Sequence, residues 1–310
     1  MRQYPRRLPN PTYFLPLFIG AMAVHGQALQ TSDRSGAWQL PSCEEMSRAC
    51  APANAQACVD AGDCLLAKAD PGKQTRNTEI ARDLFTQACE LDFGRGCSAL
   101  GTLLGAGFRM PIDRRGSQGA YARAGTLLVA ECRRGDALSC TELARLLDEK
   151  QLASVPETAD VWFERGMTLL VKQCERGEPH ACVLASSALT NAPASRKNSR
   201  LLRSVLEHGC AQGDGWSCCQ LAQTTGGDRE RLQLMERACA SKGFSCCADA
   251  ARIYAAAGAL ERAAALYEMA CAGGLCQSCL DLADAYEHGR GVRVDLQRAA
   301  ELRAVRCALE

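Results

Sequence analysis

The sequence predicts an all-α fold, a solenoid of αα-hairpins in a right-handed superhelix with a disulfide joining the two helices of each hairpin. Three observations predict it. The composition is rich in Ala and poor in runs of β-branched residues, one cysteine spacing recurs along the chain, and apolar residues at helical spacing flank the cysteine pairs. A supersecondary unit repeated every 20–50 residues is typical of solenoids.

Length and charge limit the classes of function. A chain of 310 residues can bury a substantial core, as one elongated domain or as two compact ones. Its 36 basic and 35 acidic residues leave a formal net charge of +1. This balance gives no electrostatic reason to expect a nucleic-acid partner.

The cysteines carry the repeat. Seven pairs share the spacing C-x7-C: Cys50 with Cys58, Cys89 with Cys97, Cys132 with Cys140, Cys174 with Cys182, Cys210 with Cys218, Cys239 with Cys247, and Cys271 with Cys279. From Cys89 onward the pairs recur at intervals of 29 to 43 residues. One gap repeated seven times defines a repeat unit of the length expected for an αα-hairpin, and we expect each pair to form a disulfide.

Each unit has two helical patterns with a turn between the cysteines. Before Cys89 the apolar stripe comprises Ile80, Leu84, Phe85 and Ala88, and after Cys97 it comprises Leu100, Leu103 and Leu104. A glycine lies in most turns, where the left-handed conformation that ends a helix is expected: Gly94, Gly135, Gly177, Gly213, Gly243 and Gly274. The cysteines then face each other across the turn, and each bridge stabilises the fold by about 2–3 kcal/mol.

The predicted organisation follows from these patterns. A signal peptide at 1–28 and a linker at 29–42 precede a repeat array at 43–310. Its hairpins lie near 43–66, 76–106, 117–148, 160–190, 199–224, 229–257 and 261–288, with a terminal helix at 295–308.

The N-terminus has the order of a secretory signal. Arg2, Arg6 and Arg7 precede the apolar run 12–24, and small residues follow, with cleavage candidates at 21–23 and 26–28. The alternative is a disordered, Pro-rich terminus. Twenty cysteines favour disulfides in an oxidising compartment, so we expect an exported protein, periplasmic or secreted. No later segment is apolar enough for a membrane span.

The last complete unit resembles a known repeat family. Residues 261–302 carry Leu-Tyr at 266–267, Ala-Cys at 270–271, the Cys-x-x-Leu-Ala-x-x-Tyr run at 279–286, Gly-x-Gly-Val at 289–292 and Asp295. This pattern looks like a Sel-one-like repeat, a relative of the tetratricopeptide unit. The disulfide-linked version is similar to the Helicobacter cysteine-rich proteins, often described as β-lactamase-like. The resemblance covers roughly residues 76–310, and the middle units depart from it.

Six cysteines stand outside the repeated pairs. Cys43 and Cys64 fit a second bridge in the first hairpin. Cys219 and Cys246 adjoin paired cysteines, rotated about 100° around their helices, and could join neighbouring units. Cys276 and Cys307 then remain as the last candidate disulfide pair. Sequence does not determine connectivity, so other pairings stay open.

Motifs for catalysis or metal binding are weak. The one C-x-x-C, Cys276 to Cys279, shares a cysteine with a repeated pair and lacks the further ligands of a zinc site, so we expect no metal and no cofactor. It also lacks the βαβ context of a thioredoxin-like site. The serine-hydrolase motifs S-x-x-K, S-D-N, K-T-G and G-x-S-x-G are absent from the sequence. Whether the protein is an enzyme stays open, with a non-enzymatic role favoured.

Charged residues of the last hairpins form a candidate binding face. Asp281, Asp284 and His288 share one face of a predicted helix, and Asp249 and Arg252 lie close to it on the equivalent helix one unit earlier. In repeat arrays such helices line the surface that binds extended peptides, although an ordinary solvated face has the same pattern. The favoured function is a scaffold for a protein or peptide partner. The resemblance implies two alternatives, a β-lactamase or penicillin-binding hydrolase, and a redox or metallo-assembly factor.

Overall fold

A computed structural model describes residues 42–67, 74–152, 155–178 and 180–304. Over these residues the predicted all-α fold of αα-hairpins is confirmed: consecutive helices pack in pairs, and β-pairing is limited to an isolated bridge between Ala51 and Asn54. The predicted signal peptide and most of the predicted linker lie outside the described residues. No helix within the described part is both long and apolar enough to cross a bilayer.

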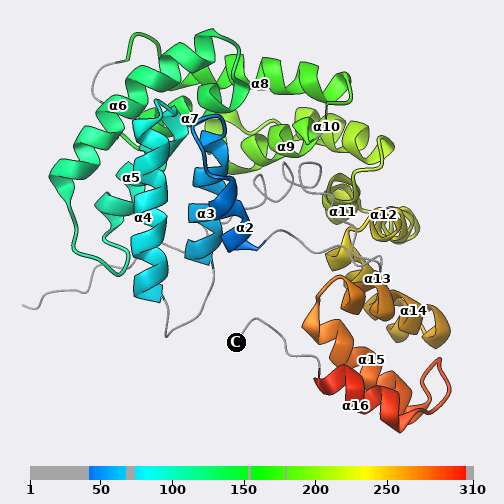
Figure 1. Ribbon diagram of the computed structural model, residues 1–310. Helices are drawn as coiled ribbons and strands as arrows, with labels where there is room; N and C mark the ends of the chain where they lie inside the picture. The colour runs from blue at the N-terminus through cyan, green and yellow to red at the C-terminus, as the bar shows by residue number, and fades with distance from the viewer. Residues whose placement is uncertain (1–41, 68–73, 153–154, 179, 305–310) are drawn as a thin grey trace, which may run out of the picture. The chain divides into compact units, whose positions relative to one another are not determined.

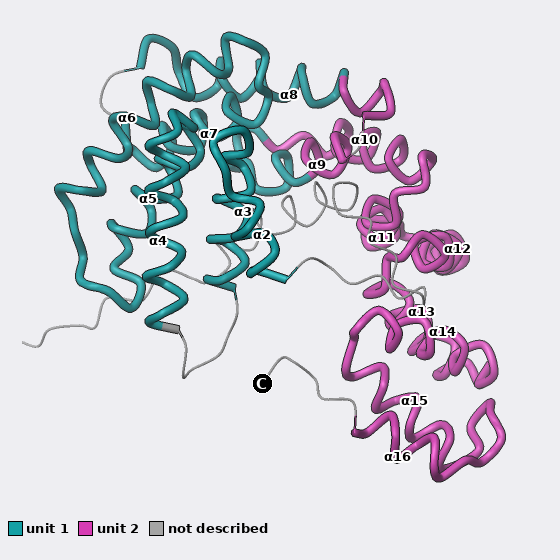
Figure 2. Tube along the Cα trace, viewed as in Figure 1, with its two compact units in different colours: residues 1–172, 187–196 teal, residues 173–186, 197–310 magenta. Residues whose placement is uncertain are grey.

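The chain divides into two compact units (Figure 2). Unit 1 comprises residues 1–172 and 187–196, and unit 2 comprises residues 173–186 and 197–310. Unit 1 contains α2 (Cys43–Ala49), α3 (Ala55–Ala67), α4 (Gln74–Glu90), α5 (Gly94–Ala106), α6 (Arg114–Arg133), α7 (Ala137–Asp148) and the short 3-10 helix η2 (Ala194–Arg196). The boundary between the units passes through α8 (Ala159–Glu175) and α9 (Ala181–Asn191).

Unit 2 continues the same pattern (Figure 1). It contains α10 (Ser199–Ala211), α11 (Gly215–Thr224), α12 (Asp228–Ala240), α13 (Phe244–Ala256), α14 (Leu260–Ala272), α15 (Cys276–His288) and α16 (Leu296–Ala304). Each helix of this series contacts the next one. The second helices of adjacent hairpins also meet within unit 1, where α5 contacts both α3 and α7.

Disulfides join the two helices of each hairpin. In all seven C-x7-C pairs the sulfurs are 1.97 to 2.11 Å apart and the Cα atoms 4.4 to 4.9 Å apart. The bonded pairs are Cys50 with Cys58, Cys89 with Cys97, Cys132 with Cys140, Cys174 with Cys182, Cys210 with Cys218, Cys239 with Cys247, and Cys271 with Cys279.

The first of these pairs lies in a turn of a different local form. Cys58 of α3 bonds to Cys50 across a turn that contains the isolated bridge between Ala51 and Asn54, with the Cα atoms of the cysteines 4.5 Å apart. Cys182 in the first turn of α9 bonds to Cys174 near the end of α8, with Cα atoms 4.6 Å apart. The Cys50–Cys58 pair therefore keeps the Cα spacing of the other hairpins, such as Cys174–Cys182, even though its turn contains the bridge.

The remaining cysteines connect further segments. Cys43 bonds to Cys64 in the first hairpin, and Cys219 of α11 bonds to Cys246 of α13. Cys276 is also disulfide-bonded, and its predicted partner, Cys307, lies outside the described residues.

Most turns follow one rule, which differs in part from the predicted one. The residue three after the first cysteine takes the left-handed conformation in six turns, and it is glycine in four of them: Gly135, Gly177, Gly213 and Gly274. In the other two turns it is Asp92 and Lys242. The expectation of a left-handed glycine at Gly94 and Gly243 is therefore wrong. These glycines permit close packing instead, since a Cβ on Gly94 would lie 2.8 Å from a Glu131 oxygen, and one on Gly243 2.8 Å from the Ala238 carbonyl oxygen.

Side-chain caps fix where several second helices begin. Asp136 accepts from the backbone N–H groups of Leu138 and Ser139 at the start of α7. Asp214 accepts from Trp216 and Ser217 in the same way at the start of α11. Both carboxylates occupy the N-cap position, where they satisfy N–H groups that have no partner within the helix.

The cores of the units differ in composition. The largest fully buried side chains include Trp162, Phe85, Leu103 and Leu128, all in unit 1. The main buried cluster of unit 2 is built largely from small residues, with Cys210, Cys218, Cys219, Cys239, Cys246 and Cys247 beside alanines. Small side chains bury little apolar area each, so the three disulfides formed by these cysteines add to the stability that burial gives this cluster.

Candidate functional site

The second helices of three unit 1 hairpins bring together a set of buried polar side chains. We call it the unit-1 cluster: Asp60 and Asp63 of α3, Ser98 of α5, and Glu142, Arg145 and the following Glu149 of α7. Residues three or four apart on a helix share a face, and α5 lies against both other helices. Asp60, Asp63, Ser98 and Glu142 are all less than a tenth exposed.

Glu142 and Arg145 form the centre of the cluster. The guanidinium of Arg145 donates to both oxygens of Glu142, at 2.6 and 2.9 Å, and to Glu149 at 2.7 Å. The Ser98 hydroxyl donates a very short hydrogen bond to Glu142, and Arg145 reaches the same hydroxyl at 3.2 Å. This network joins α5 to α7 through polar groups.

Ion pairing sets the charge states at this centre. Burial alone would raise the pKa of Glu142, but the charge and hydrogen bonds of Arg145, with the Ser98 bond, outweigh it and hold that pKa below its ordinary value. Burial would likewise lower the pKa of Arg145, and the two neighbouring glutamates raise it instead. The pair is therefore ionised at neutral pH.

The pKa of Asp63 is raised, whereas that of Glu142 is lowered. Burial, followed by the charges of Asp60 and Glu142, raises the pKa of Asp63 to about 8. The carboxyl is 7% exposed and makes no hydrogen bond or ion pair with any residue in the described part of the chain. Asp60, one turn earlier, accepts from the Gln56 amide at 2.6 Å. Groups with strongly shifted pKa values gather at functional sites, which makes this cluster the candidate site.

The five residues predicted as a binding face all lie in unit 2. We call them the unit-2 stripe: Asp249 and Arg252 on α13, and Asp281, Asp284 and His288 on α15. Arg252 donates a very short hydrogen bond to Asp249, and Gln277 donates to Asp281 at 3.0 Å. Arg252 and Asp281 both act on Tyr267, whose pKa is raised by burial and by Asp281, with Arg252 opposing.

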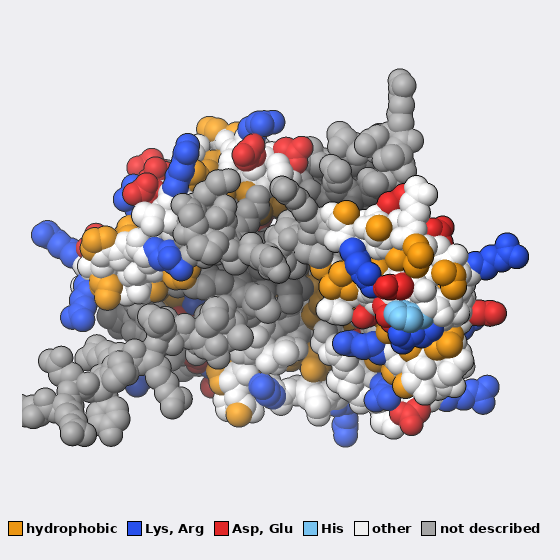
Figure 3. Space-filling model, turned by 90° about the horizontal axis from the view of Figure 1, so that it is seen from below, with side chains coloured by type: hydrophobic (Ala, Val, Ile, Leu, Met, Phe, Trp, Pro, Cys, Tyr) orange, Lys and Arg blue, Asp and Glu red, His pale blue; other side chains and the backbone are white. Residues whose placement is uncertain are grey.

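The rest of the stripe is an exposed ion-pair group. His288 Nδ1 lies 3.0 Å from a carboxylate oxygen of Asp284, and Arg290 lies 2.8 Å from the other oxygen. The side chains of His288 and Asp284 are 53% and 41% exposed. Figure 3 shows acidic and basic side chains interspersed with apolar ones on the surface seen there. Such exposed pairs contribute little to stability.

One sequence signal links the two groups. Charged residues stand two and five positions after the second cysteine of four hairpins, those of Cys58, Cys140, Cys247 and Cys279. The resulting pairs are Asp60 with Asp63, Glu142 with Arg145, Asp249 with Arg252, and Asp281 with Asp284. The predicted binding face was chosen from residues that share a helix face, and it took residues from the last two hairpins only. Applied to the whole chain, the same offset finds the acidic and basic core of the unit-1 cluster, which the sequence analysis missed.

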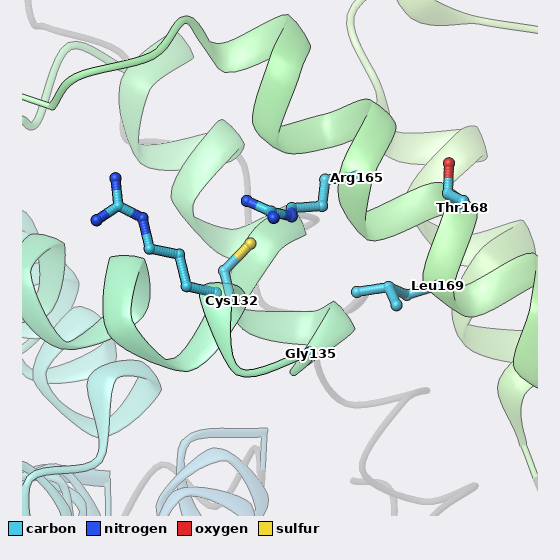
Figure 4. Close-up of a pocket in the computed structure, with 6 residues that line it drawn as sticks. Cys132, Gly135, Arg165, Thr168 and Leu169 are labelled. Carbon is cyan, nitrogen blue, oxygen red and sulfur yellow. The ribbon is translucent and has the colours of Figure 1, made fainter.

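An open pocket of about 430 Å³ lies in unit 1 beside the α6–α7 turn (Figure 4). Cys132, Arg133 and Gly135 line it from the turn, and Arg165, Thr168 and Leu169 line it from α8. Cys132 is bonded to Cys140, and Arg133 lies 3.8 Å from Glu157. These six lining residues include no carboxylate or imidazole, so they offer no acid–base pair for catalysis.

Comparisons with known proteins find structural neighbours only. No family model and no curated protein matches the sequence. A protective antigen of uropathogenic Escherichia coli strains, described as displaying an SLR fold, matches at 16% identity and a TM-score of 0.40 over 85% of this chain and 59% of that one. A Sel1 repeat protein from Oxalobacter formigenes matches at 12% identity and a TM-score of 0.41 over 77% of this chain and 95% of that one. At these scores the matches carry no argument about this protein, and its fold class rests on the helix pairs described above.

Proposed function

We propose that this protein is an exported, disulfide-stapled helical scaffold that binds a protein partner through the second helices of its hairpins. The observation that carries the proposal is the unit-2 stripe on the second helices α13 and α15, where the side chains of Arg252, Asp284 and His288 are 64%, 41% and 53% exposed. Two successive hairpins of unit 2 that place charged side chains at the equivalent position create a patterned surface. Such a surface can match the charges of an extended partner.

Disulfide content supports export. Nine disulfides lie within the described residues, and all cysteines there are bonded. Disulfides form and persist in oxidising compartments. The signal-like N-terminal sequence is the second support, and the mass of the mature protein tests it. Cleavage after residue 23 or 28 agrees with export, and an intact N-terminus contradicts it.

The experiment that tests the scaffold is a capture of partners from the exported fraction. The oxidised protein, the double variant Asp281→Lys/Asp284→Lys and the control Glu261→Lys are immobilised in parallel. Glu261 lies in the first turn of α14 in the same hairpin, is exposed, and makes no ion pair with any described residue. We expect a partner that binds the wild type and the control and is lost from the double variant. Equal capture by all three baits, or capture by none, contradicts the proposal.

An assay of nitrocefin hydrolysis distinguishes a hydrolase from a scaffold. Turnover of nitrocefin by the oxidised, purified protein, abolished by substitution of a defined polar group, would favour the hydrolase over the scaffold. The scaffold requires no turnover above the rate of a reduced and unfolded sample.

A further inference from the structure

The pocket beside the α6–α7 turn has two guanidinium groups on its walls. Arg133 lines it from the end of α6, and Arg165 lines it from α8. Figure 4 shows Arg165 and Leu169 extending from α8 toward the turn, where the sulfur of Cys132 faces them. The pocket volume of about 430 Å³ lies within the range of small-molecule sites, roughly 300–1,000 Å³. The pocket therefore combines the volume for a small ligand with positive charge on two walls.

Neither guanidinium makes a hydrogen bond with the described residues. The one contact that the structure gives Arg165 is with the ring of Trp162, whose centre lies 6.0 Å from the guanidinium carbon. Arg133 lies 3.8 Å from a carboxylate oxygen of Glu157, which is longer than a hydrogen bond. By contrast, Arg196 of the same unit donates to Asp148 at 2.6 and 2.8 Å. The donors of Arg133 and Arg165 can therefore bind a ligand without breaking a hydrogen bond of the fold.

The other polar groups of the pocket have partners within the chain. The backbone N–H of Gly135 donates to the Cys132 carbonyl at 3.0 Å, and the Thr168 hydroxyl donates to the Glu164 carbonyl at 2.8 Å. Apart from neighbours in the chain, no described heavy atom lies within 4 Å of the position that a Cβ on Gly135 would take, so the turn leaves this side of the pocket open. Polar recognition in the pocket is therefore left to the two arginines.

We propose that this pocket binds a small organic monocarboxylate. Its carboxylate accepts hydrogen bonds from Arg165 and Arg133, because the planar guanidinium fork matches the two oxygens of a carboxylate. Its apolar body contacts Leu169 and the disulfide of Cys132. This site lies in unit 1 and goes beyond the proposed scaffold function, which was assigned to the unit-2 stripe.

Charge complementarity favours one negative charge over two. Arg133 and Arg165 contribute two positive charges, and Glu157 beside Arg133 offsets one of them, which leaves one positive charge at the pocket. A monocarboxylate balances that charge, whereas a dianion such as sulfate leaves a negative charge in excess. Glu157 also competes with the ligand for Arg133, so its removal should favour binding.

The test uses 4-methylpentanoate as the probe, 4-methylpentanamide as its uncharged match and sulfate as the dianion. The oxidised full chain carries ¹³C at the leucine methyl groups, and its spectra are followed during titration at pH 7. We expect 4-methylpentanoate to shift the Leu169 methyl signals in a saturable manner. The amide should not shift them, and sulfate should bind more weakly than the acid.

Three variants identify the groups that hold the carboxylate. Arg165→Gln should raise the dissociation constant of 4-methylpentanoate about tenfold, because it removes a hydrogen-bond donor to a charged group. Glu157→Gln should lower the dissociation constant, because it removes the competing carboxylate. The control, Arg134→Gln, makes the same change as Arg165→Gln at an exposed residue that follows α6 and is not among the lining residues, and should leave binding unchanged. Thermal melts check that each variant folds.

Several results would overturn the inference. One is a Leu169 signal that does not move over the soluble range of 4-methylpentanoate, and another is binding of the amide or sulfate as tightly as the acid. A third is Arg165→Gln binding as the wild type does. Equal weakening by Arg165→Gln and Arg134→Gln would mean that the acid responds to surface charge and not to the pocket. Partner capture by the unit-2 stripe is measured separately, so failure of either proposal leaves the other standing.

Discussion

Two ion pairs at equivalent positions show how differently the two units use one pattern. Glu142–Arg145 in unit 1 and Asp249–Arg252 in unit 2 both stand two and five residues after a paired cysteine. The Glu142 and Arg145 side chains are 11% and 35% exposed, whereas those of Asp249 and Arg252 are 33% and 64% exposed. The two pairs have the same position within their helices, and the packing of neighbouring helices determines how far each pair is buried.

The neighbours differ in how adjacent second helices are joined. In unit 1, Ser98 of α5 bonds to Glu142 of α7, so a polar network connects the two helices. In unit 2, Cys219 of α11 and Cys246 of α13 form a covalent bond between the corresponding helices. The first connection depends on charge state, and the second depends on oxidation. Each of these two connections should therefore respond to a different perturbation.

The largest change in the free energy of unfolding is expected when the acidic partner of the buried pair is removed, and the exposed pair serves as the comparison. Glu142→Ala leaves Arg145 with Glu149 as its acidic partner, removes the acceptor of the Ser98 hydroxyl, and should lower the free energy of unfolding by about 3–5 kcal/mol. Asp249→Ala removes an exposed pair and should lower it by at most about 1 kcal/mol. Urea unfolding of the two variants measures the difference. Equal losses would mean that the burial contrast has no energetic consequence.

A somewhat smaller effect is expected from the bridge between hairpins in unit 2. Removing Cys219–Cys246 in the double alanine variant should cost about 3.5 kcal/mol, because its loop is long. The control, Cys239→Ala/Cys247→Ala, opens a sequence separation of 8 and should cost about 2.5 kcal/mol. Hydrogen exchange should show the loss in α11 and α13 and leave α5 and α7 protected. Faster exchange in α5 and α7 would contradict independent connections.

The fold class could be predicted because its signal is local and repeated. The seven C-x7-C pairs mark the turns, and apolar stripes at helical spacing mark the helices on either side. The conformation of the turns was predicted less well. Asp92 and Lys242 take the left-handed conformation that glycine takes elsewhere, because the position after the cysteine, and not the glycine, defines the turn.

The candidate site could be predicted only in part. The offset from the cysteines gives Asp60 and Asp63 the same position within their own helix as Asp281 and Asp284 have in theirs. It does not show which of the two helix faces is covered by neighbouring helices. Burial depends on the packing of α3, α5 and α7, and this packing joins residues far apart in the sequence, such as Ser98 and Glu142. No local pattern reports such contacts.

The smallest expected effect, and the one most specific to unit 1, is the pH dependence contributed by Asp63. Its folded pKa of about 8 lies above the ordinary value of 3.8, so the neutral carboxyl is favoured in the folded protein. The associated stability is complete below pH 3.8 and is lost as the pH rises through about 8.

Between pH 6 and pH 7 the folded protein therefore holds a proton that the unfolded chain does not, and stability falls by about 1.4 kcal/mol per pH unit from this group. Asp63→Asn removes the titration and keeps the shape of the side chain. Urea unfolding of both proteins at pH 6 and pH 7 should show the wild type losing about 1.4 kcal/mol more than the variant. Asp281→Asn, in the exposed stripe of unit 2, should lose as much as the wild type. If wild type and Asp63→Asn follow the same slope, Asp63 is ionised in the folded protein and its burial does not raise its pKa.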